Sequence, residues 1–155
     1  MEIQFNKIYE MYNQDIYRLI YSYTLDYAES KDILQETFFK YYKNINKLPP
    51  TPEEIKKWLM KVSINTSKDY LRKIIKCRFL YENEIEGYKS PENNDLELID
   101  ILKKLKKKYR IPIFLYYYEG YKIQEIAALL NLKESAVKMR ISRARKIIKE
   151  EMELI

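Results

Sequence analysis

Basic side chains recur near the C-terminus of this chain at the spacing of one helix face. Between Glu134 and Glu150, apolar residues fall at steps of three and four, which predicts an amphipathic helix. The opposite face is rich in ammonium and guanidinium groups, which pair with phosphates and donate to guanine edges, so it has the chemistry of a DNA contact. This face comprises Lys138, Met139, Ser142, Arg143, Lys146 and Lys149.

The residues just upstream complete the layout of a helix-turn-helix. A short helix over 122–130 carries the small Ala127 where two helices must approach closely. Asn131 stands in the turn, where a left-handed backbone is needed and Asn tolerates it better than most residues. In this motif the second helix lies in the major groove. The alternative is an amphipathic helix with a solvated basic face, but the three features together favour the motif.

A second set of cations follows a helix start near residue 51. Thr51 can cap the helix, Pro52 suits its first position and Glu54 completes a capping box. The inner stripe is expected to contain Ile55, Leu59, Val62, Thr66 and Tyr70. The outer side carries Lys57, Lys61, Lys68 and Arg72. Trp58 is tempting as a base-stacking platform, but its position favours packing at the edge of the inner stripe.

An acid-amide-acid patch lies on a further predicted helix, over residues 28–44. Its buried face is expected to hold Leu34, Phe38, Tyr41 and Ile45. Outward-pointing acids beside an exposed aromatic ring indicate a protein contact, with an ordinary solvated face as the alternative. The outward side chains are Asp32, Gln35, Glu36 and Phe39.

The composition favours helices and excludes several kinds of site. Only 2 of the 155 residues are glycine, whereas sheet proteins need many turns. There is no histidine and Cys77 is the only cysteine, so zinc sites built on Cys and His are excluded, as are histidine-based catalytic devices. No apolar run approaches the ~18 residues of a membrane span, and no signal peptide is evident, so we expect a cytoplasmic protein without membrane insertion.

The charge is unevenly distributed along the chain. Residues 49–76 contain 7 basic and 3 acidic side chains and residues 101–155 contain 14 and 6, whereas residues 77–100 between them contain 2 and 7. Two basic blocks separated by an acidic connector suggest two surfaces for a polyanion. We predict an all-α fold of two small helical domains, 1–76 and 95–155, joined by a flexible acidic linker over 77–94, with the helix-turn-helix in the second domain.

Three blocks of sequence resemble the sigma-70 family of transcription-initiation factors, in the right order and at the right spacing. The first block resembles part of the family's second region, the next block continues that region, and the last resembles the fourth region. The third region is missing, an arrangement similar to the small extracytoplasmic-function (ECF) group. The blocks are AESKDILQETF at 28–38, WLMKVSIN at 58–65 with DYLRK at 69–73, and 109–145 with EIA at 125–127, AVK at 136–138 and RAR at 143–145.

The resemblance implies a role for each surface. The patch with Asp32, Gln35 and Glu36 would dock on the clamp helices of the largest RNA polymerase subunit. The cations of 57–72 would meet phosphates of the promoter −10 element, while Asn65 would help to hold a flipped base in a pocket shaped by the loop 46–51. The basic face of 138–149 would contact the −35 element. The implied function is promoter recognition and DNA melting as a dissociable polymerase subunit, with core polymerase and promoter DNA as partners.

Other functions remain to be weighed against this one. A stand-alone helix-turn-helix regulator would explain residues 95–155 but leave the first two blocks idle. A decoy that binds polymerase but not promoters would not need the strongly basic C-terminal part. An enzyme is not expected, nor are a catalytic residue, a cofactor or a metal. The sequence leaves open whether an anti-sigma factor exists, and it does not define the promoter sequence or a role for Cys77.

Overall fold

The computed structural model of this chain describes residues 2–81 and 102–153. Its described residues form helices and no strands, so the predicted all-α fold is confirmed. The chain divides into two compact units, Met1–Ser90 and Pro91–Ile155. Most of the expected linker, including the acidic stretch 82–100, lies outside the described residues. No helix in the described ranges is long and apolar enough to cross a bilayer.

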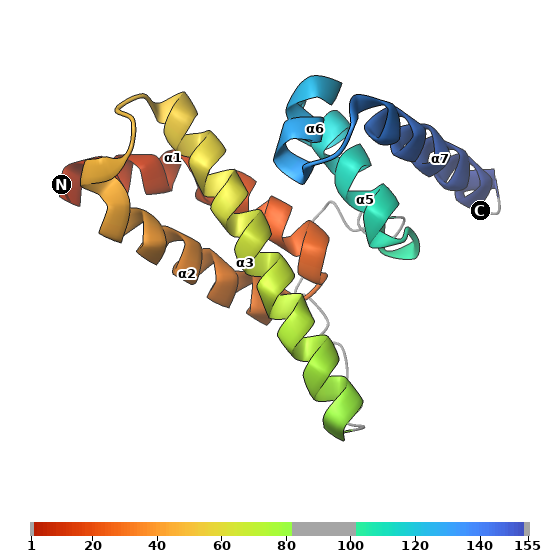
Figure 1. Cartoon of the computed structure of the whole chain (residues 1–155), viewed down its shortest axis with the longest axis horizontal. Coiled ribbons are helices and arrows are strands. Elements are labelled where there is room, and N and C mark those ends of the chain that lie inside the picture. Colours follow the sequence, from red (N-terminus) through yellow and green to blue (C-terminus); the bar gives the residue numbers. More distant parts are fainter. Residues whose placement is uncertain (1, 82–101, 154–155) are drawn as a thin grey trace. The chain divides into compact units, whose positions relative to one another are not determined.

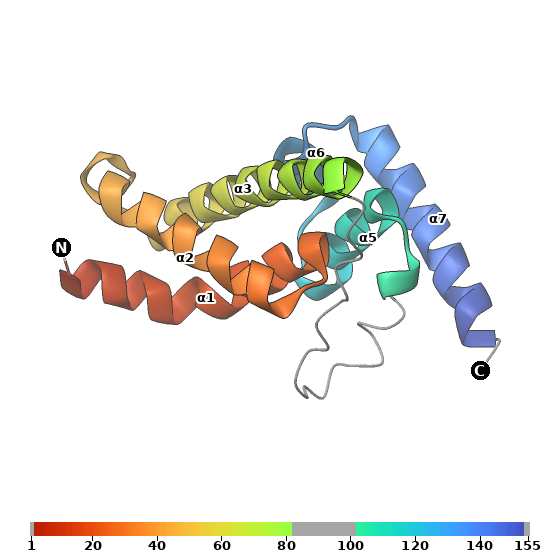
Figure 2. The same cartoon turned by 90° about the horizontal axis from the view of Figure 1, so that it is seen from below.

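Unit 1 is a bundle of three helices. They are α1 (Glu2–Thr24), α2 (Tyr27–Asn44) and α3 (Pro52–Tyr81), with a short 3-10 helix η1 (Ile45–Lys47) after α2. Each of the three long helices packs against the other two, as Figures 1 and 2 show from two directions. A bundle of this kind keeps one face of each helix exposed, and the predicted sites lie on such faces.

The core of unit 1 follows the helical spacing of its apolar residues, with one shift on α2. Phe38, Tyr41 and Ile45 are buried as expected, whereas Leu34 is only half-buried. Ile33 and Thr37 are fully enclosed in its place, and the Thr37 hydroxyl donates to the Ile33 carbonyl at 2.8 Å. The buried face of α2 is therefore centred slightly to one side of the predicted stripe, because α2 has to meet both α1 and α3.

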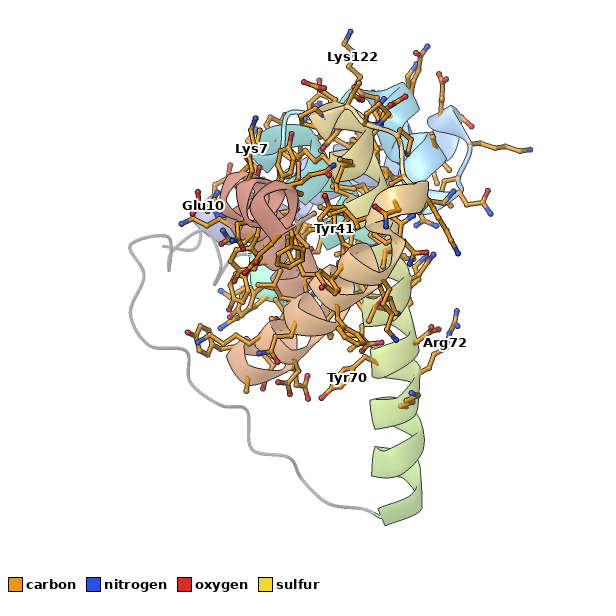
Figure 3. The ribbon with its side chains drawn as sticks, turned by 90° about the vertical axis from the view of Figure 1, so that its left-hand side faces the viewer. Lys7, Glu10, Tyr41, Tyr70, Arg72 and Lys122 are labelled. Atoms are coloured by element: carbon orange, nitrogen blue, oxygen red, sulfur yellow. The ribbon has the colours of Figure 1, made fainter. Side chains whose placement is uncertain are left out.

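Aromatic rings fill the end of unit 1 where α1 begins. The ring of Phe5 stacks on Tyr41 with a centroid distance of 5.7 Å, and Tyr9 meets Phe38 edge-on at 4.9 Å. Trp58 is half-buried with its centroid 6.4 Å from that of Tyr41, which confirms its packing role at the edge of the core. Burial raises the pKa of Tyr41, which lies among the helices in Figure 3.

The start of α3 matches the sequence prediction and its end does not. The helix begins at Pro52, and the hydroxyl of Thr51 donates to the Glu54 carboxylate at 2.7 Å, as the capping residues predict. It then continues to Tyr81, beyond the expected end near residue 76. Proline and glycine are absent from this extension, and the first acid of the connector is Glu82. Nothing in the local sequence therefore stops the helix earlier.

Unit 2 is built around its last helix. Its elements are α5 (Lys107–Ile113), the π-helix η2 (Phe114–Tyr118), α6 (Ile123–Leu130) and α7 (Glu134–Glu153). Helix α7 packs against both α5 and α6, and η2 continues α5 toward α6 (Figure 1). Its apolar core comes from all four elements and from the segment before α5: Leu105, Ile111, Ile113, Phe114, Leu115, Ile126, Ala127, Val137, Ile141 and Ala144.

Pro112 lies inside α5. The helix begins at Lys107, so the proline ring removes a hydrogen bond that Lys108 would otherwise accept. The turn that follows is the π-helix. Burial of Ile111, Ile113 and Phe114 holds this segment helical despite the lost bond. The segment ends at Gly120, whose φ of 71° is a left-handed conformation that favours glycine.

Candidate functional site

The outward face of α2 carries the predicted acidic patch: Asp32, Gln35, Glu36 and Phe39. All four side chains are exposed, and Phe39 shows 57% of its surface to solvent. Their spacing of three and four residues places them on one side of the helix. Burial and the carboxylates of Glu29 and Asp32 raise the pKa of Tyr70 on α3, which leans toward α2 in Figure 3. The patch thus begins beside α3 and continues along α2.

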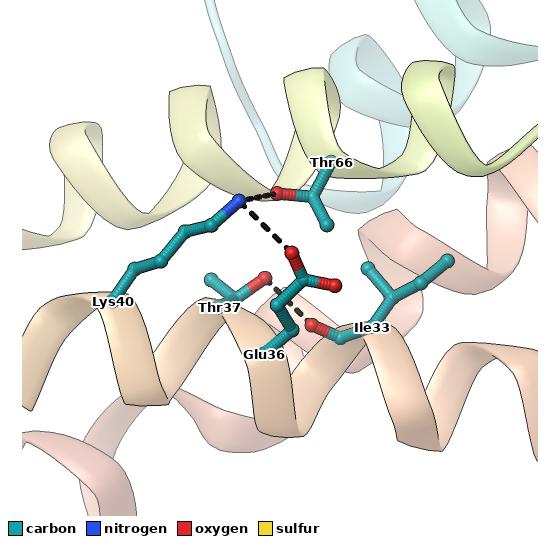
Figure 4. A network of polar contacts seen from close by, with 5 residues as sticks. All are labelled: Ile33, Glu36, Thr37, Lys40 and Thr66. Carbon is teal, nitrogen blue, oxygen red and sulfur yellow. Dashed lines mark hydrogen bonds and ion pairs between the residues drawn. The ribbon is translucent and has the colours of Figure 1, made fainter.

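One member of the acidic patch is tied to α3 through a lysine that the sequence analysis did not single out. The ammonium of Lys40 lies 3.2 Å from the Glu36 carboxylate and donates to the Thr66 hydroxyl at 3.0 Å (Figure 4). Thr66 is buried, whereas Lys40 and Glu36 are about half exposed. The Glu-to-Lys spacing of four residues indicates the ion pair, but only the packing of α2 on α3 brings Thr66 to it.

Helix α3 presents the predicted basic stripe: Lys57, Lys61, Asn65, Lys68 and Arg72. Lys68 is half-buried and the other four are exposed. Arg72 extends away from α3 in Figure 3 and forms an ion pair with Asp69 at 3.1 Å. Within the described residues, Lys57 and Lys61 form no ion pair or hydrogen bond, so both ammonium groups are available to a ligand. The Asn65 side chain is exposed, although the next residue, Thr66, is buried.

The helix-turn-helix geometry of unit 2 is as predicted. Helix α6 ends in Asn131, which has the left-handed angles φ 54° and ψ 49°, and the next amide, of Leu132, donates to the Ala127 carbonyl at 2.9 Å. Ala127 is buried, as expected for a small residue where α6 and α7 pack together. On α7, Val137, Ile141 and Ala144 are buried, and all face the rest of unit 2.

The opposite face of α7 is exposed at every predicted position. Met139 is 52% exposed, and the remaining side chains are polar or basic. We call this set the α7 face: Lys138, Met139, Ser142, Arg143, Lys146 and Lys149. A convex helix surface with several cations and few acids can enter a major groove and pair with phosphates and base edges.

Two exposed arginines of α7 donate to tyrosine hydroxyls from other elements of unit 2, and the sequence did not reveal these contacts. Arg143 donates through Nη1 to the Tyr109 hydroxyl at 3.4 Å. That hydrogen bond is the main cause of a lowered pKa of Tyr109. Arg145 donates to the Tyr117 hydroxyl, and its guanidinium lies 5.2 Å from the centroid of that ring. The Tyr117 side chain is 60% exposed, so it lies at the surface of unit 2 rather than in its core.

Comparison with protein families assigns both units. Residues 8–74 match sigma-70 region 2, and residues 95–148 match sigma-70 region 4. The first match covers the acidic patch and the basic stripe, and the second covers the whole helix-turn-helix. A stand-alone regulator would leave residues 8–74 without a role, so this alternative is set aside.

Relatives in Bacillus subtilis (strain 168) are similar over nearly the whole chain. RNA polymerase sigma factor SigV is 33% identical over 141 residues, which are 89% of this chain and 84% of SigV. ECF RNA polymerase sigma factor SigM is 30% identical over 152 residues, which are 93% of this chain and 92% of SigM. At this identity and coverage, the similarity extends to both units.

Solved structures share the fold at lower identity. The sigma factor RpoE from Bartonella quintana, in complex with the anti-sigma factor NepR, aligns with a TM-score of 0.84 at 17% identity, covering 97% of each chain. CnrH, in complex with the cytosolic domain of CnrY, aligns with a TM-score of 0.70 at 22% identity, covering 99% of this chain and 90% of CnrH. The family models, the relatives and the helix-turn-helix geometry agree: the chain belongs to the sigma-70 family, in its ECF group, and is an RNA polymerase sigma factor for transcription initiation.

Proposed function

We propose that this sigma factor brings core RNA polymerase to two-part promoters through three separate surfaces and helps to open the DNA there. The acidic patch of α2 binds the clamp helices of the polymerase largest subunit. The basic stripe of α3 binds the −10 element, and the α7 face binds the −35 element. The observation that carries the proposal is that the three predicted side-chain sets are exposed, except for the half-buried Lys68, on helices that lie largely within the matched regions.

The domain assignment follows from these surfaces. Residues 1–76 would form the polymerase- and −10-binding domain, 77–94 the linker, and 95–155 the −35-binding domain. As a DNA-binding regulatory subunit, the protein would have no active site of its own, because nucleotide addition belongs to the polymerase. The promoter DNA that it would bind is part of the bacterial chromosome, so we expect the protein to act in the cytoplasm.

Melting is assigned to the basic stripe because its chemistry suits a single strand. Lys57 and Lys61 can follow phosphates, while the Asn65 amide can donate to and accept from the edge of one extruded base. Extrusion costs a few kcal/mol of stacking, and binding of the flipped base would offset it without ATP. The segment 46–51, which contains the end of η1 and the residues that join it to α3, would line that pocket.

An anti-sigma partner is also proposed. The solved RpoE and CnrH structures are complexes with NepR and CnrY, respectively, and the shared fold supports a partner of the same kind for this chain. Such a partner would compete with polymerase or DNA for the exposed surfaces. Its chemistry does not follow from the described residues.

Site-specific photocrosslinking in the polymerase complex tests the three assignments together. A photoreactive amino acid would replace Phe39, Lys61 or Ser142 in turn, with exposed Gln14 on α1 as the control position. We expect position 39 to crosslink to the largest polymerase subunit, position 61 to the non-template strand near −10, and position 142 to the −35 duplex. A crosslink from position 39 to DNA, or from position 142 to polymerase alone, would contradict the assignment of that surface.

A further inference from the structure

Arg143 differs from the lysines around it because another helix holds it. Its Nη1 donates to the hydroxyl of Tyr109, which lies on α5 and is 34 residues away in sequence. Among the described residues, Lys138, Lys146 and Lys149 of the same α7 face form no hydrogen bond or ion pair. The α7 face therefore contains one cation with a fixed neighbour and several without.

Tyr109 is well placed to fix the direction of that guanidinium. Its ring packs against the core cluster of Leu105, Ile113 and Ala144, so its hydroxyl projects from the core of unit 2. A tyrosine side chain has only two torsions, whereas arginine has four, so the tyrosine is the more rigid member of the pair. The lowered pKa of Tyr109 fits a hydroxyl that accepts from a cation. The hydrogen bond to Tyr109 thus restricts the orientations that the Arg143 guanidinium can adopt.

The contact leaves Arg143 able to bind a base. A guanidinium has five N–H donors, and the Tyr109 hydroxyl engages one nitrogen. The remaining donors can still form the paired hydrogen bonds that guanine O6 and N7 accept in the major groove. Such paired bonds need a fixed plane, whereas a phosphate contact tolerates many directions. Holding Arg143 in one direction consequently favours base selection more than general affinity.

We propose that Tyr109 is a positioning residue that sharpens −35 sequence preference by orienting Arg143. This proposal rests on the proposed function of the α7 face. In this proposal Tyr109 does not contact DNA. It forms a hydrogen bond with Arg143, and Arg143 contacts the DNA.

The second tyrosine–arginine pair provides a matched control. Arg145 donates to the Tyr117 hydroxyl and lies near the rings of Tyr116 and Tyr117, at 5.6 Å and 5.2 Å from their centroids. It stands on the other side of the buried Ala144 from Arg143, and Tyr117 is exposed. Tyr117→Phe removes the same group as Tyr109→Phe, but from an arginine outside the proposed α7 face.

The test is transcription by reconstituted holoenzyme from a template library randomised in the −35 element. The variants are Tyr109→Phe, Arg143→Ala, the double variant and Tyr117→Phe, with far-UV circular dichroism to verify folding. We expect Arg143→Ala to abolish preference at one or two base pairs. Tyr109→Phe should reduce preference at the same positions roughly threefold, the scale of one hydrogen bond, and add nothing to Arg143→Ala in the double variant. Tyr117→Phe should retain the wild-type preference.

The outcomes separate this inference from the proposed function. If Arg143→Ala alters the −35 preference while Tyr109→Phe keeps the wild-type profile, or lowers all activities equally, the positioning role is wrong and the α7 assignment stands. If Tyr109→Phe alters the preference further in the absence of Arg143, the tyrosine acts on DNA by another route and the inference is also wrong. If Arg143→Ala itself leaves the preference unchanged, the base-contact assignment fails and the positioning role fails with it.

Discussion

The two proposed DNA surfaces hold their cations in different ways. On α3, the ammonium groups of Lys57 and Lys61 have no fixed neighbour among the described residues, and Arg72 is paired only with exposed Asp69. On the α7 face, Lys138, Lys146 and Lys149 also have no fixed neighbour in the part of the chain that the structure describes, whereas Arg143 donates to the hydroxyl of Tyr109. Mobile point charges suit the variable path of a single strand, whereas directed guanidinium groups suit the fixed edges of a duplex. The difference teaches that burial and charge alone do not distinguish the two kinds of DNA contact.

Unit 1 also differs because we propose a second contact, with polymerase, on a neighbouring helix. The acidic patch of α2 and the basic stripe of α3 carry opposite charges and are separated by the Glu36–Lys40–Thr66 network (Figure 4). Lys40 screens Glu36 from the stripe and joins the two helices. Polymerase binding and DNA binding can thereby occupy adjacent faces of one small bundle.

The largest effect is expected from removal of the acidic patch. Replacing Asp32, Gln35 and Glu36 by Ala should weaken binding to core polymerase by roughly 100-fold, because a few residues carry most of an interface's energy. Fluorescence anisotropy with labelled protein measures this, and circular dichroism should show unchanged helicity. A matched control replaces exposed Glu2, Glu10 and Gln14 of α1, which have the same charges. If the α2 variant bound core polymerase as strongly as the wild type, the proposed polymerase contact of the acidic patch would be wrong.

The next effect distinguishes separation of the DNA strands from initial binding of the promoter. Asn65→Ala should impair strand separation about tenfold while changing closed-complex formation little, because its amide would contact a base only after that base is extruded. Permanganate footprinting of the −10 element measures unpaired thymine, and a gel shift at low temperature measures the closed complex. Lys149→Ala provides the comparison from unit 2 and should lower binding without changing the opened fraction. Undiminished footprints with Asn65→Ala would assign this residue to helix packing.

A smaller effect separates phosphate contacts from base contacts within unit 2. Lys149→Ala should weaken binding to all −35 sequences alike and reduce the slope of log affinity against log salt by about one unit. Arg143→Ala and Lys138→Ala should instead cost about 1–3 kcal/mol at particular base pairs and flatten the preference there. Titrations of holoenzyme with several −35 duplexes at increasing salt measure both quantities. A uniform loss for Arg143→Ala would place this residue among the phosphate contacts.

The smallest effect concerns the polar bridge of unit 1. Lys40→Met keeps the aliphatic stem but removes the bond to Thr66 and the ion pair with Glu36. Because Lys40 is about half exposed, solvent screens the pair, and we expect a loss of about 0.5 kcal/mol in the free energy of unfolding. Urea denaturation measures it, with Lys7→Met on the exposed side of α1 as the control. Equal stability of Lys40→Met and the wild type would mean that the bridge does not fasten α2 to α3.

Local signals in the sequence determine much of this architecture. The start of α3 at Pro52 and the left-handed Asn131 follow from residues within one helical turn, and both were predictable. The exposed positions of the acidic patch, the basic stripe and the α7 face follow from helical periodicity. These features depend on residues that are close together in the chain, so they can be predicted from a single sequence.

The contacts between elements could not be predicted in the same way. Lys40 meets Thr66 across 26 residues, and Arg143 meets Tyr109 across 34, so both depend on how helices pack. Tertiary burial also overrides a local rule at Pro112, which lies inside a helix that its buried neighbours maintain. The sequence thus indicated which side chains could bind a ligand but not which of them are held in a fixed direction.

Transcription by core polymerase with and without the wild-type chain tests the central claim most directly. The template would be a DNA library with 60 or so randomised base pairs upstream of a reporter, and transcript 5′ ends would be sequenced together with their templates. The account predicts new transcripts whose templates share two short motifs at a constant spacing, with the upstream motif altered by Arg143→Ala and transcription lost with the α2 triple variant. Transcripts no different from those of core polymerase alone, or templates that share only one motif, would contradict it.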